Sequence, residues 1–151
     1  MKKDGRLSGV LHIILHLAQA AKPVTSERLA VAMKTNPVVV RRTLSDLRDR
    51  GIVSSEKGHG GGWQICCNLK TTSLLTVYDA LGAPDCIALT HRDETSTCLV
   101  EQAVNTALGD AFEEAEKLLL TRLGQITLAD LSANFHSLHA ICEIGLQGEK
   151  Q

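Results

Sequence analysis

The pattern of apolar and polar positions in the first third of the chain predicts two short helices. Residues 7–21 carry apolar side chains at helical spacing, and a lysine–proline pair ends that run. A hydroxyl from Thr25 or Ser26 caps the next helix by accepting a backbone N–H, and apolar positions carry this helix to Lys34. The polar pair at 35–36 breaks it, because both side chains compete for backbone hydrogen bonds.

A third helix begins at Pro37, whose fixed φ and missing N–H suit the first helical position. Val40, Leu44 and Leu47 follow at i, i+4 and i+7 and predict one buried stripe. Gly51 ends the helix, where a left-handed residue is wanted. The face opposite the stripe is polar and basic, with Arg41, Arg42, Thr43, Arg48 and Arg50.

Residues 52–55 and 63–66 read as two short strands joined by a glycine-rich loop, which predicts a β-hairpin. Helix, turn, arginine-bearing helix and hairpin together predict a winged helix-turn-helix, a unit that sets its second helix in the major groove of DNA. The alternative is a winged helix that serves only as a protein-interaction module. Basic charge on both the helix and the loop favours DNA.

The second half of the chain predicts a helix from Leu74 to Leu81, an irregular loop over 85–97 and a long helix from Cys98 to about Leu123. A last short helix begins within 126–131. The long helix exceeds what so small a domain needs for its own core, so we interpret it as a dimerisation helix rather than an ordinary core helix. Its apolar positions lie close to a heptad seam of Val100, Val104, Ala107, Ala111, Ala115 and Leu118. The fold class is therefore mainly α with a small β-hairpin wing.

Charge divides the 151-residue chain into two unlike halves. Residues 1–70 hold 12 Lys/Arg against 5 Asp/Glu, a net charge of +7, whereas residues 71–151 hold 4 against 12, a net charge of −8. A basic half that coincides with the winged helix is the electrostatic signature of a nucleic-acid binder.

The first 20 residues resemble a secretion signal in outline, but His12, His16 and Gln19 interrupt the apolar run. We therefore predict a cytoplasmic protein. Five cysteines in such a chain indicate thiols or ligands rather than structural disulfides. No nucleophile elbow, phosphate loop or zinc-spaced motif is present, and the sequence predicts no enzyme.

Four segments together resemble the Rrf-two (BadM) family of bacterial winged-helix transcription regulators. They are T-S-E-x-L-A at 25–30, L-S-D-L-R-D-R-G-I-V at 44–53, K-G-H-G-G-G-W at 57–63 and Q-I-T-L-A-D-L at 125–131. The resemblance covers nearly the whole chain. It implies a homodimer with crossed long helices that binds a partly palindromic double-stranded operator, usually as a repressor. It also divides the chain into a DNA-binding domain over 1–81, a sensor loop over 82–97 and a dimerisation region over 98–151.

Carried over position by position, the resemblance places DNA-facing residues at the start of the recognition helix and at the wing. Arginine there either reads guanine edges or clamps phosphate. His59 either enters a minor groove or is a solvated loop histidine. The valines are poor in base-reading groups, which predicts limited specificity from the helix alone. The candidates are Val38, Val39, Arg41, Arg42, Lys57, His59 and Gly60.

Many relatives hold an iron–sulfur cluster through three evenly spaced cysteines before the long helix. Cys86 and Cys98 match the outer two positions, but Arg92 occupies the central one. His91, or His12 from a partner's first helix, is a candidate replacement ligand; the alternative for His12 is a partly buried core histidine. The second sensing option is thiol chemistry at Cys86 and Cys98, which would make the regulator redox-responsive; the alternative is that both cysteines are unreactive. We expect no resident cofactor, with the cluster as the alternative.

Overall fold

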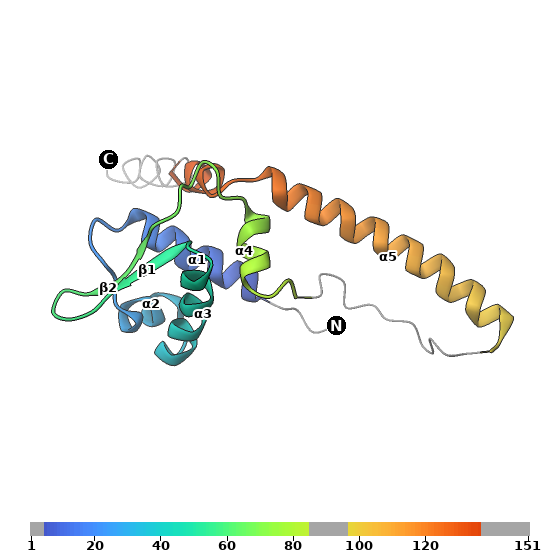
Figure 1. Cartoon of the computed structure of the whole chain (residues 1–151), viewed down its shortest axis with the longest axis horizontal. Helices are drawn as coiled ribbons and strands as arrows, with labels where there is room; N and C mark the ends of the chain where they lie inside the picture. The colour runs from blue at the N-terminus through green and yellow to red at the C-terminus, as the bar shows by residue number, and fades with distance from the viewer. Residues whose placement is uncertain (1–4, 85–96, 137–151) are drawn as a thin grey trace, which may run out of the picture.

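A winged head and a long helical arm make up the structure (Figure 1). This computed structural model describes residues 5–84 and 97–136. The predicted loop over 85–97 therefore lies almost wholly outside the described residues. The mainly helical fold with a small hairpin is confirmed. The head comprises α1 (Arg6–Gln19), α2 (Ser26–Met33), α3 (Pro37–Asp49), β1 (Val53–Glu56), β2 (Gly62–Ile65) and α4 (Leu74–Ala80). The arm is α5 (Leu99–Gln125).

One hydrophobic core fills the head, where α1, α2, α3 and the hairpin meet. The predicted stripe of α3 lies at its centre, because Val40, Leu44 and Leu47 are all 0% exposed. Ile14 of α1 and Leu29 of α2 pack into the same cluster. Burial of one face of α3 leaves the opposite face in solvent, which fixes the orientation of its arginines.

The turn between α2 and α3 is built by side-chain and backbone caps. Thr25 Oγ1 accepts a hydrogen bond from the Arg28 N–H at 3.3 Å and begins α2, as predicted. Lys34 ends that helix in the left-handed conformation, with φ of 51°. Asn36 Oδ1 accepts from the Val38 N–H at 2.8 Å, and Pro37 occupies the first turn of α3. The prediction that the polar pair at 35–36 ends α2 is therefore confirmed, and the Asn36 side chain in addition caps the start of α3.

The first strand of the hairpin begins one residue later than predicted, and the second strand begins one residue earlier. Its antiparallel register pairs Val53 with Ile65 and Glu56 with Gly62. Ile52 precedes the strand because its N–H donates to the Leu47 carbonyl at 3.0 Å and extends the end of α3. Cys66, predicted as the last residue of the second strand, instead follows it; Cys66 is exposed, and the next residue, Cys67, is half-buried.

Trp63 of β2 anchors the wing to the rest of the head. Its indole N–H donates to Ser26 Oγ at 3.0 Å in a buried position, and its backbone exchanges two hydrogen bonds with Val24 at 2.8 and 2.9 Å. A Cβ atom on the neighbouring Gly62 would lie 2.7 Å from the Val24 carbonyl, so glycine alone fits this close approach. The wing, the α1–α2 connection and the first turn of α2 thus form one unit.

A second junction holds the arm against the head. Thr127 and Asp130 form reciprocal caps: Asp130 Oδ2 accepts from the Thr127 N–H at 2.9 Å, and Thr127 Oγ1 accepts from the Asp130 N–H at 3.1 Å. The helical segment 128–136 follows, and its Leu128 is 1% exposed in the core. Leu74 of α4 donates to the Ile126 carbonyl at 2.9 Å across the same junction. The T-L-A-D-L segment after the long helix therefore supplies a helix cap, through Thr127 and Asp130, and a core residue, Leu128.

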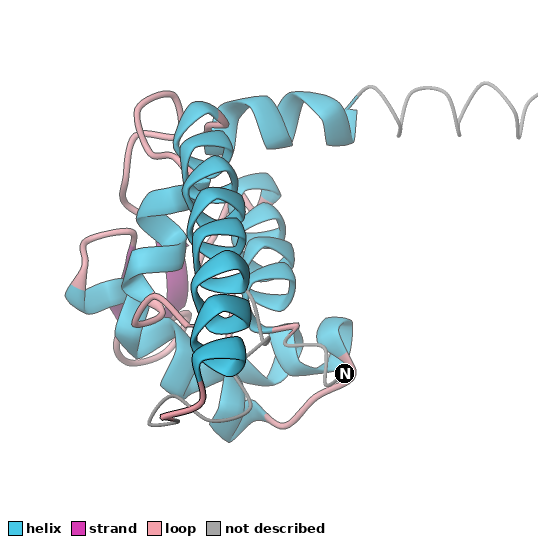
Figure 2. Ribbon diagram, turned by 90° about the vertical axis from the view of Figure 1, so that its right-hand side faces the viewer, coloured by secondary structure: helices cyan, strands magenta, loops and turns pink. Residues whose placement is uncertain are grey.

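The arm itself makes little use of the core, and within the described structure none of the residues of α5 is buried. Figure 2 shows α5 crossing in front of the head as a separate column. Neither α5 nor any other described helix combines the length and hydropathy needed to span a bilayer. The apolar side chains of α5 therefore remain available to pack against another surface.

Removal of the Trp63–Ser26 hydrogen bond tests the wing anchor. In the Ser26→Ala variant the indole N–H keeps its buried position without an acceptor, which costs about 1–3 kcal/mol of unfolding free energy. Trp63→Phe and the double variant complete a thermodynamic cycle measured by chemical denaturation. A coupling energy near zero between positions 26 and 63 would refute the anchor; Ser55→Ala, on the exposed part of β1, is the control and should leave stability unchanged.

Candidate nucleic-acid interface

The first two turns of α3 present a mixed apolar and cationic surface to solvent. Val38 is 64% exposed and Val39 is 55% exposed, whereas Val40 is fully buried and belongs to the core. Arg42 lies one helical turn after Val38 and therefore on the same face. No acidic residue lies in the first turn of α3. This end of the helix carries the chemistry expected of a surface that meets DNA edges and phosphates.

Arg41 and Arg42, which the sequence treats alike, have different surroundings. Arg41 Nη2 bonds to Glu27 Oε1 of α2 at 2.8 Å, and both side chains are more than half exposed. Hydrogen bonds from the Glu27 N–H and from Arg41 lower the pKa of the Glu27 carboxyl, which keeps it charged. Sequence reasoning missed this role for Glu27, which is a first-turn acid in α2. Arg41 is thus tied to its neighbour helix, while Arg42 extends from the exposed face.

The C-terminal half of α3 has a different character. Asp46 and Asp49 are exposed there, and both would repel a phosphate backbone. Arg48 bonds to Ser45 Oγ at 3.0 Å, approaches Asp49 at 3.6 Å and lies 6.0 Å from the centre of the Trp63 ring. Its guanidinium therefore links α3 to the base of the wing. Charge and exposure together distinguish the exposed, cationic N-terminal half of α3 from its C-terminal half, which carries both signs of charge.

The wing loop brings the second group of candidate residues to the surface. Lys57, His59 and Gly60 are all exposed at its tip. Gly58 and Gly60 have φ of 95° and 78°, a left-handed conformation that makes the tight loop possible. At the base of the wing, Gln64 Nε2 donates a hydrogen bond to Glu56 Oε1 at 2.9 Å. The carboxylate of Glu56, the one acidic residue of the hairpin, is therefore hydrogen-bonded within the wing. The tip points away from α5, toward the opposite end of the molecule (Figure 1).

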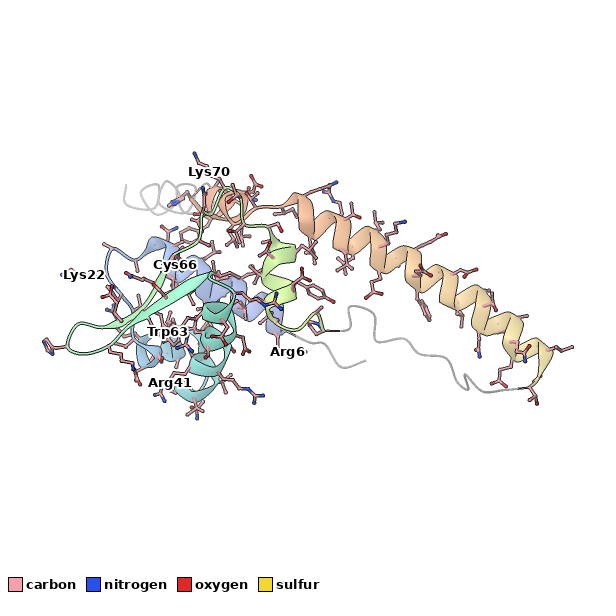
Figure 3. The ribbon with its side chains drawn as sticks, in the orientation of Figure 1. Arg6, Lys22, Arg41, Trp63, Cys66 and Lys70 are labelled. Carbon is pink, nitrogen blue, oxygen red and sulfur yellow. The ribbon has the colours of Figure 1, made fainter. Side chains whose placement is uncertain are left out.

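Basic side chains surround these two surfaces over the whole head. Figure 3 shows Arg6, Lys22, Arg41 and Lys70 distributed along it, whereas acidic side chains lie along α5. The exposed basic residues include Lys22, Arg28, Lys34, Arg42, Arg50, Lys57 and Lys70. The charge asymmetry read from the sequence thus becomes a separation in space between a cationic head and an anionic arm.

The candidate sensor residues are only partly described. Cys86 and His91 lie outside the described residues, as does Arg92. Cys98 is the exposed N-cap residue of α5, where backbone N–H groups of Glu101 and Val100 lower the pKa of its thiol. His12 is exposed, so the alternative of a partly buried core histidine is wrong; its ring stacks on His16 of the next turn. Partial burial and the neighbouring His12 lower the pKa of His16.

Comparison with known proteins agrees with this geometry. The model of the Rrf2 family, described as an iron-dependent transcriptional regulator, matches residues 4–134. A candidate HTH-type transcriptional regulator, YwnA of Bacillus subtilis (strain 168), is 30% identical over 128 residues, which cover 85% of this chain and 95% of that protein.

Solved structures extend the likeness to three dimensions. The structure of a candidate transcriptional regulator from Lactobacillus plantarum matches with a TM-score of 0.74 and 26% identity, covering 96% of this chain and 99% of the other. IscR of T. potens matches with a TM-score of 0.60 and 19% identity over 89% of this chain and 88% of its own, a likeness in fold alone. The winged-helix architecture is therefore confirmed.

The described residues hold only part of the ligand set expected for an iron–sulfur cluster, because Cys86 and His91 lie outside them. Cluster iron needs several thiolate or imidazole ligands together. Within 5–84 and 97–136, no three His, Cys, Asp or Glu side chains gather closely enough to hold a metal ion. Of the candidate ligands, Cys98 at the start of α5 and His12 on α1 are described, and His12 is expected as a ligand only from the first helix of a partner subunit.

The lowered pKa of Cys98 makes its reactivity testable. Because the thiolate is the nucleophile, Cys98 reacts with iodoacetamide at neutral pH faster than the thiol of N-acetylcysteine, and its rate rises with pH at a lower midpoint. Site-resolved mass spectrometry of a pH series measures the rate, with Cys98→Ser as the blank. A midpoint equal to or above that of N-acetylcysteine would contradict the effect of the α5 backbone N–H groups.

Proposed function

Because the chain belongs to the Rrf2 family of DNA-binding transcriptional regulators, and is not an enzyme, we propose that it acts as a homodimeric repressor on a partly palindromic operator. The observation that supports this most directly is the exposed, cationic first half of α3 beside a cationic wing tip. Each protomer would contribute one winged head from the region 1–81 and one arm from 98–151. The segment 82–97 between them is the proposed sensor loop.

In this proposal α3 contacts DNA through both apolar and charged side chains. In the proposed complex its N-terminal turns enter the major groove, where Val38 and Val39 meet thymine methyl groups. Arg42 reaches a guanine edge or a phosphate from the same face. Arg41 contributes from a position beside Glu27, which offsets part of its charge. Recognition would thus combine modest base reading with strong phosphate attraction.

The wing would contact the sugar–phosphate backbone beside the major groove. Lys57 supplies charge there, and His59 at the tip reaches the minor groove. Gly60 lets the loop approach DNA closely, since no Cβ atom intervenes. Exposure of all three residues at one tip supports this arrangement.

The apolar face of α5 supports the homodimer. Val100 is 73% exposed, Val104 49% and Leu118 66%, all on the seam predicted from the sequence. The half-buried residues of α5, including Phe112 and Leu123, lie on another side of the helix. A helix of 27 residues, about 40 Å long, offers a second copy a continuous apolar surface. Two-fold pairing would then match two heads to two half-sites.

Cys98 supports a thiol-based response as part of the same proposal. Its position at the start of α5 joins the proposed sensor loop to the dimerisation helix. A peroxide would oxidise the Cys98 thiolate to a sulfenic acid and be reduced to hydroxide, which removes charge from the helix N-terminus. This change at the root of the arm is a route from an oxidant to the spacing of the heads.

The difference between the two arginines predicts unequal effects on DNA binding. Arg42→Ala should lower operator affinity by about 1–3 kcal/mol, whereas Arg41→Ala should cost less because Glu27 already engages that guanidinium. Fluorescence anisotropy on a duplex selected from a random pool measures both, at several salt concentrations. Lys117→Ala on the arm is the control. Equal affinity of Arg42→Ala and the parent would remove α3 from the proposed interface.

The dimer is tested by a charge placed on the seam. Val104→Asp should convert the dimer to a monomer, since two carboxylates would be buried against an apolar surface. Size-exclusion chromatography with light scattering gives the mass, and circular dichroism checks that the head stays folded. Thr106→Asp adds the same charge on the far side of α5 and should stay dimeric. A Val104→Asp variant with the mass of the parent dimer would exclude this face as the interface.

A further inference from the structure

Two histidines on the exposed face of α1 approach each other more closely than any function described above requires. His12 and His16 are separated by one helical turn, and their Nε2 atoms lie 3.0 Å apart. The rings stack with centroids 4.8 Å apart and an interplanar angle of 29°. Both side chains are exposed, and the buried residues of α1 lie on the opposite face. The pair is therefore open to a ligand from solvent.

We propose that His12 and His16 bind a divalent transition-metal ion through their Nε2 atoms. Two histidines at i and i+4 on one helix face are a known chelating arrangement. Metal–nitrogen bonds of ~2.0–2.1 Å place two ligand nitrogens about 2.9 Å apart at a right angle and about 3.4 Å apart at a tetrahedral angle. The observed 3.0 Å falls within this range. Without metal, one ring can donate its Nε2–H to the other, so the geometry exists before an ion arrives.

The neighbourhood of the pair defines what kind of ion fits. Imidazole suits Ni²⁺, Cu²⁺ and Zn²⁺, and the two protein ligands leave the other coordination positions to water. No third His, Cys, Asp or Glu joins the pair in the part of the chain that is described. The site we propose is thus mononuclear and exchangeable, with two protein ligands among the described residues and water in the other positions. It shares His12, but no cysteine, with the ligands considered above for a cluster.

The site lies beside the junction between the head and the C-terminal segment. Gln19, on the same face of α1, approaches Ser132 Oγ at 3.5 Å and the His136 ring at 3.4 Å. A bound ion would cross-link two successive turns of α1 next to this contact. Metal that binds the folded chain and not the unfolded one raises its thermal stability. This gives the site a readout that is independent of DNA.

Calorimetric titration of the tag-free full chain with Ni²⁺ tests the proposal; Ni²⁺ is chosen because thiolates select Zn²⁺ and Cu⁺ more strongly. We expect one ion per chain and a rise in melting temperature on loading. His12→Gln and His16→Gln should each weaken binding by at least tenfold and abolish the rise. His59→Gln, on the wing, is the matched control and should change neither quantity.

A rescue separates the pair from an effect of either residue alone. Ser8 is exposed one turn before His12 on the same face. Ser8→His in the His16→Gln background rebuilds an i, i+4 pair and should restore Ni²⁺ binding. Parent affinity and stoichiometry in the double variant His12→Gln/His16→Gln, or no rescue in a folded Ser8→His/His16→Gln protein, would overturn the site. Because no DNA is present, neither result bears on the proposed repressor function.

Discussion

The placement of Trp63 is the constraint on which the head depends. A two-stranded hairpin is marginal by itself in water, so the wing needs an attachment to the helices. Trp63 supplies three: a buried hydrogen bond to Ser26, paired backbone bonds to Val24 and the nearby guanidinium of Arg48. Through them the wing, the start of α2 and the end of α3 share one orientation. The close approach of Gly62 to Val24 leaves little room for any other arrangement.

Once the wing is held in place, the orientation of α3 determines which of its charged residues face solvent. Its buried stripe determines which face is exposed, and its two halves then differ in charge. The first half joins exposed valines to Arg42, and the second half mixes acids with an Arg48 that is occupied by its neighbours. A uniform row of arginines would bind phosphate anywhere along the helix. In the proposed complex, this distribution instead favours insertion by the N-terminal end.

The arm, unlike the head, is not held by a buried core along its length. It holds acidic and apolar residues along 27 residues of helix, yet in the described structure it buries none of them. Its attachment comes from the residues after it, where Thr127 and Asp130 cap the next segment and Leu128 enters the core. The arm is thus held at its base and exposed along its length. An acidic arm also keeps its distance from DNA, which leaves the cationic head as the part attracted to phosphate.

The sequence by itself determined the helices of the head, the buried stripe of α3, the glycine-rich wing and the division of charge. These follow from local periodicity and composition, which any reader of the chain can count. It also predicted a hydroxyl cap from Thr25 or Ser26 and a helix start at Pro37, because helix starts depend on a few adjacent residues. The predicted strand boundaries were wrong by one residue. Ile52 hydrogen-bonds to the end of α3 instead of joining the strand, and this depends on how the hairpin packs against that helix.

Only the tertiary structure decided which side chains of distant elements meet. Glu27 and Arg41 are 14 residues apart, and Trp63 and Ser26 are 37 apart, so no periodic pattern connects either pair. The same holds for His12, whose exposure depends on which face of α1 packs inward. The closeness of its ring to His16 depends on rotamers that spacing alone leaves open. Periodicity selects a face, but the packing of the faces against one another decides the partners.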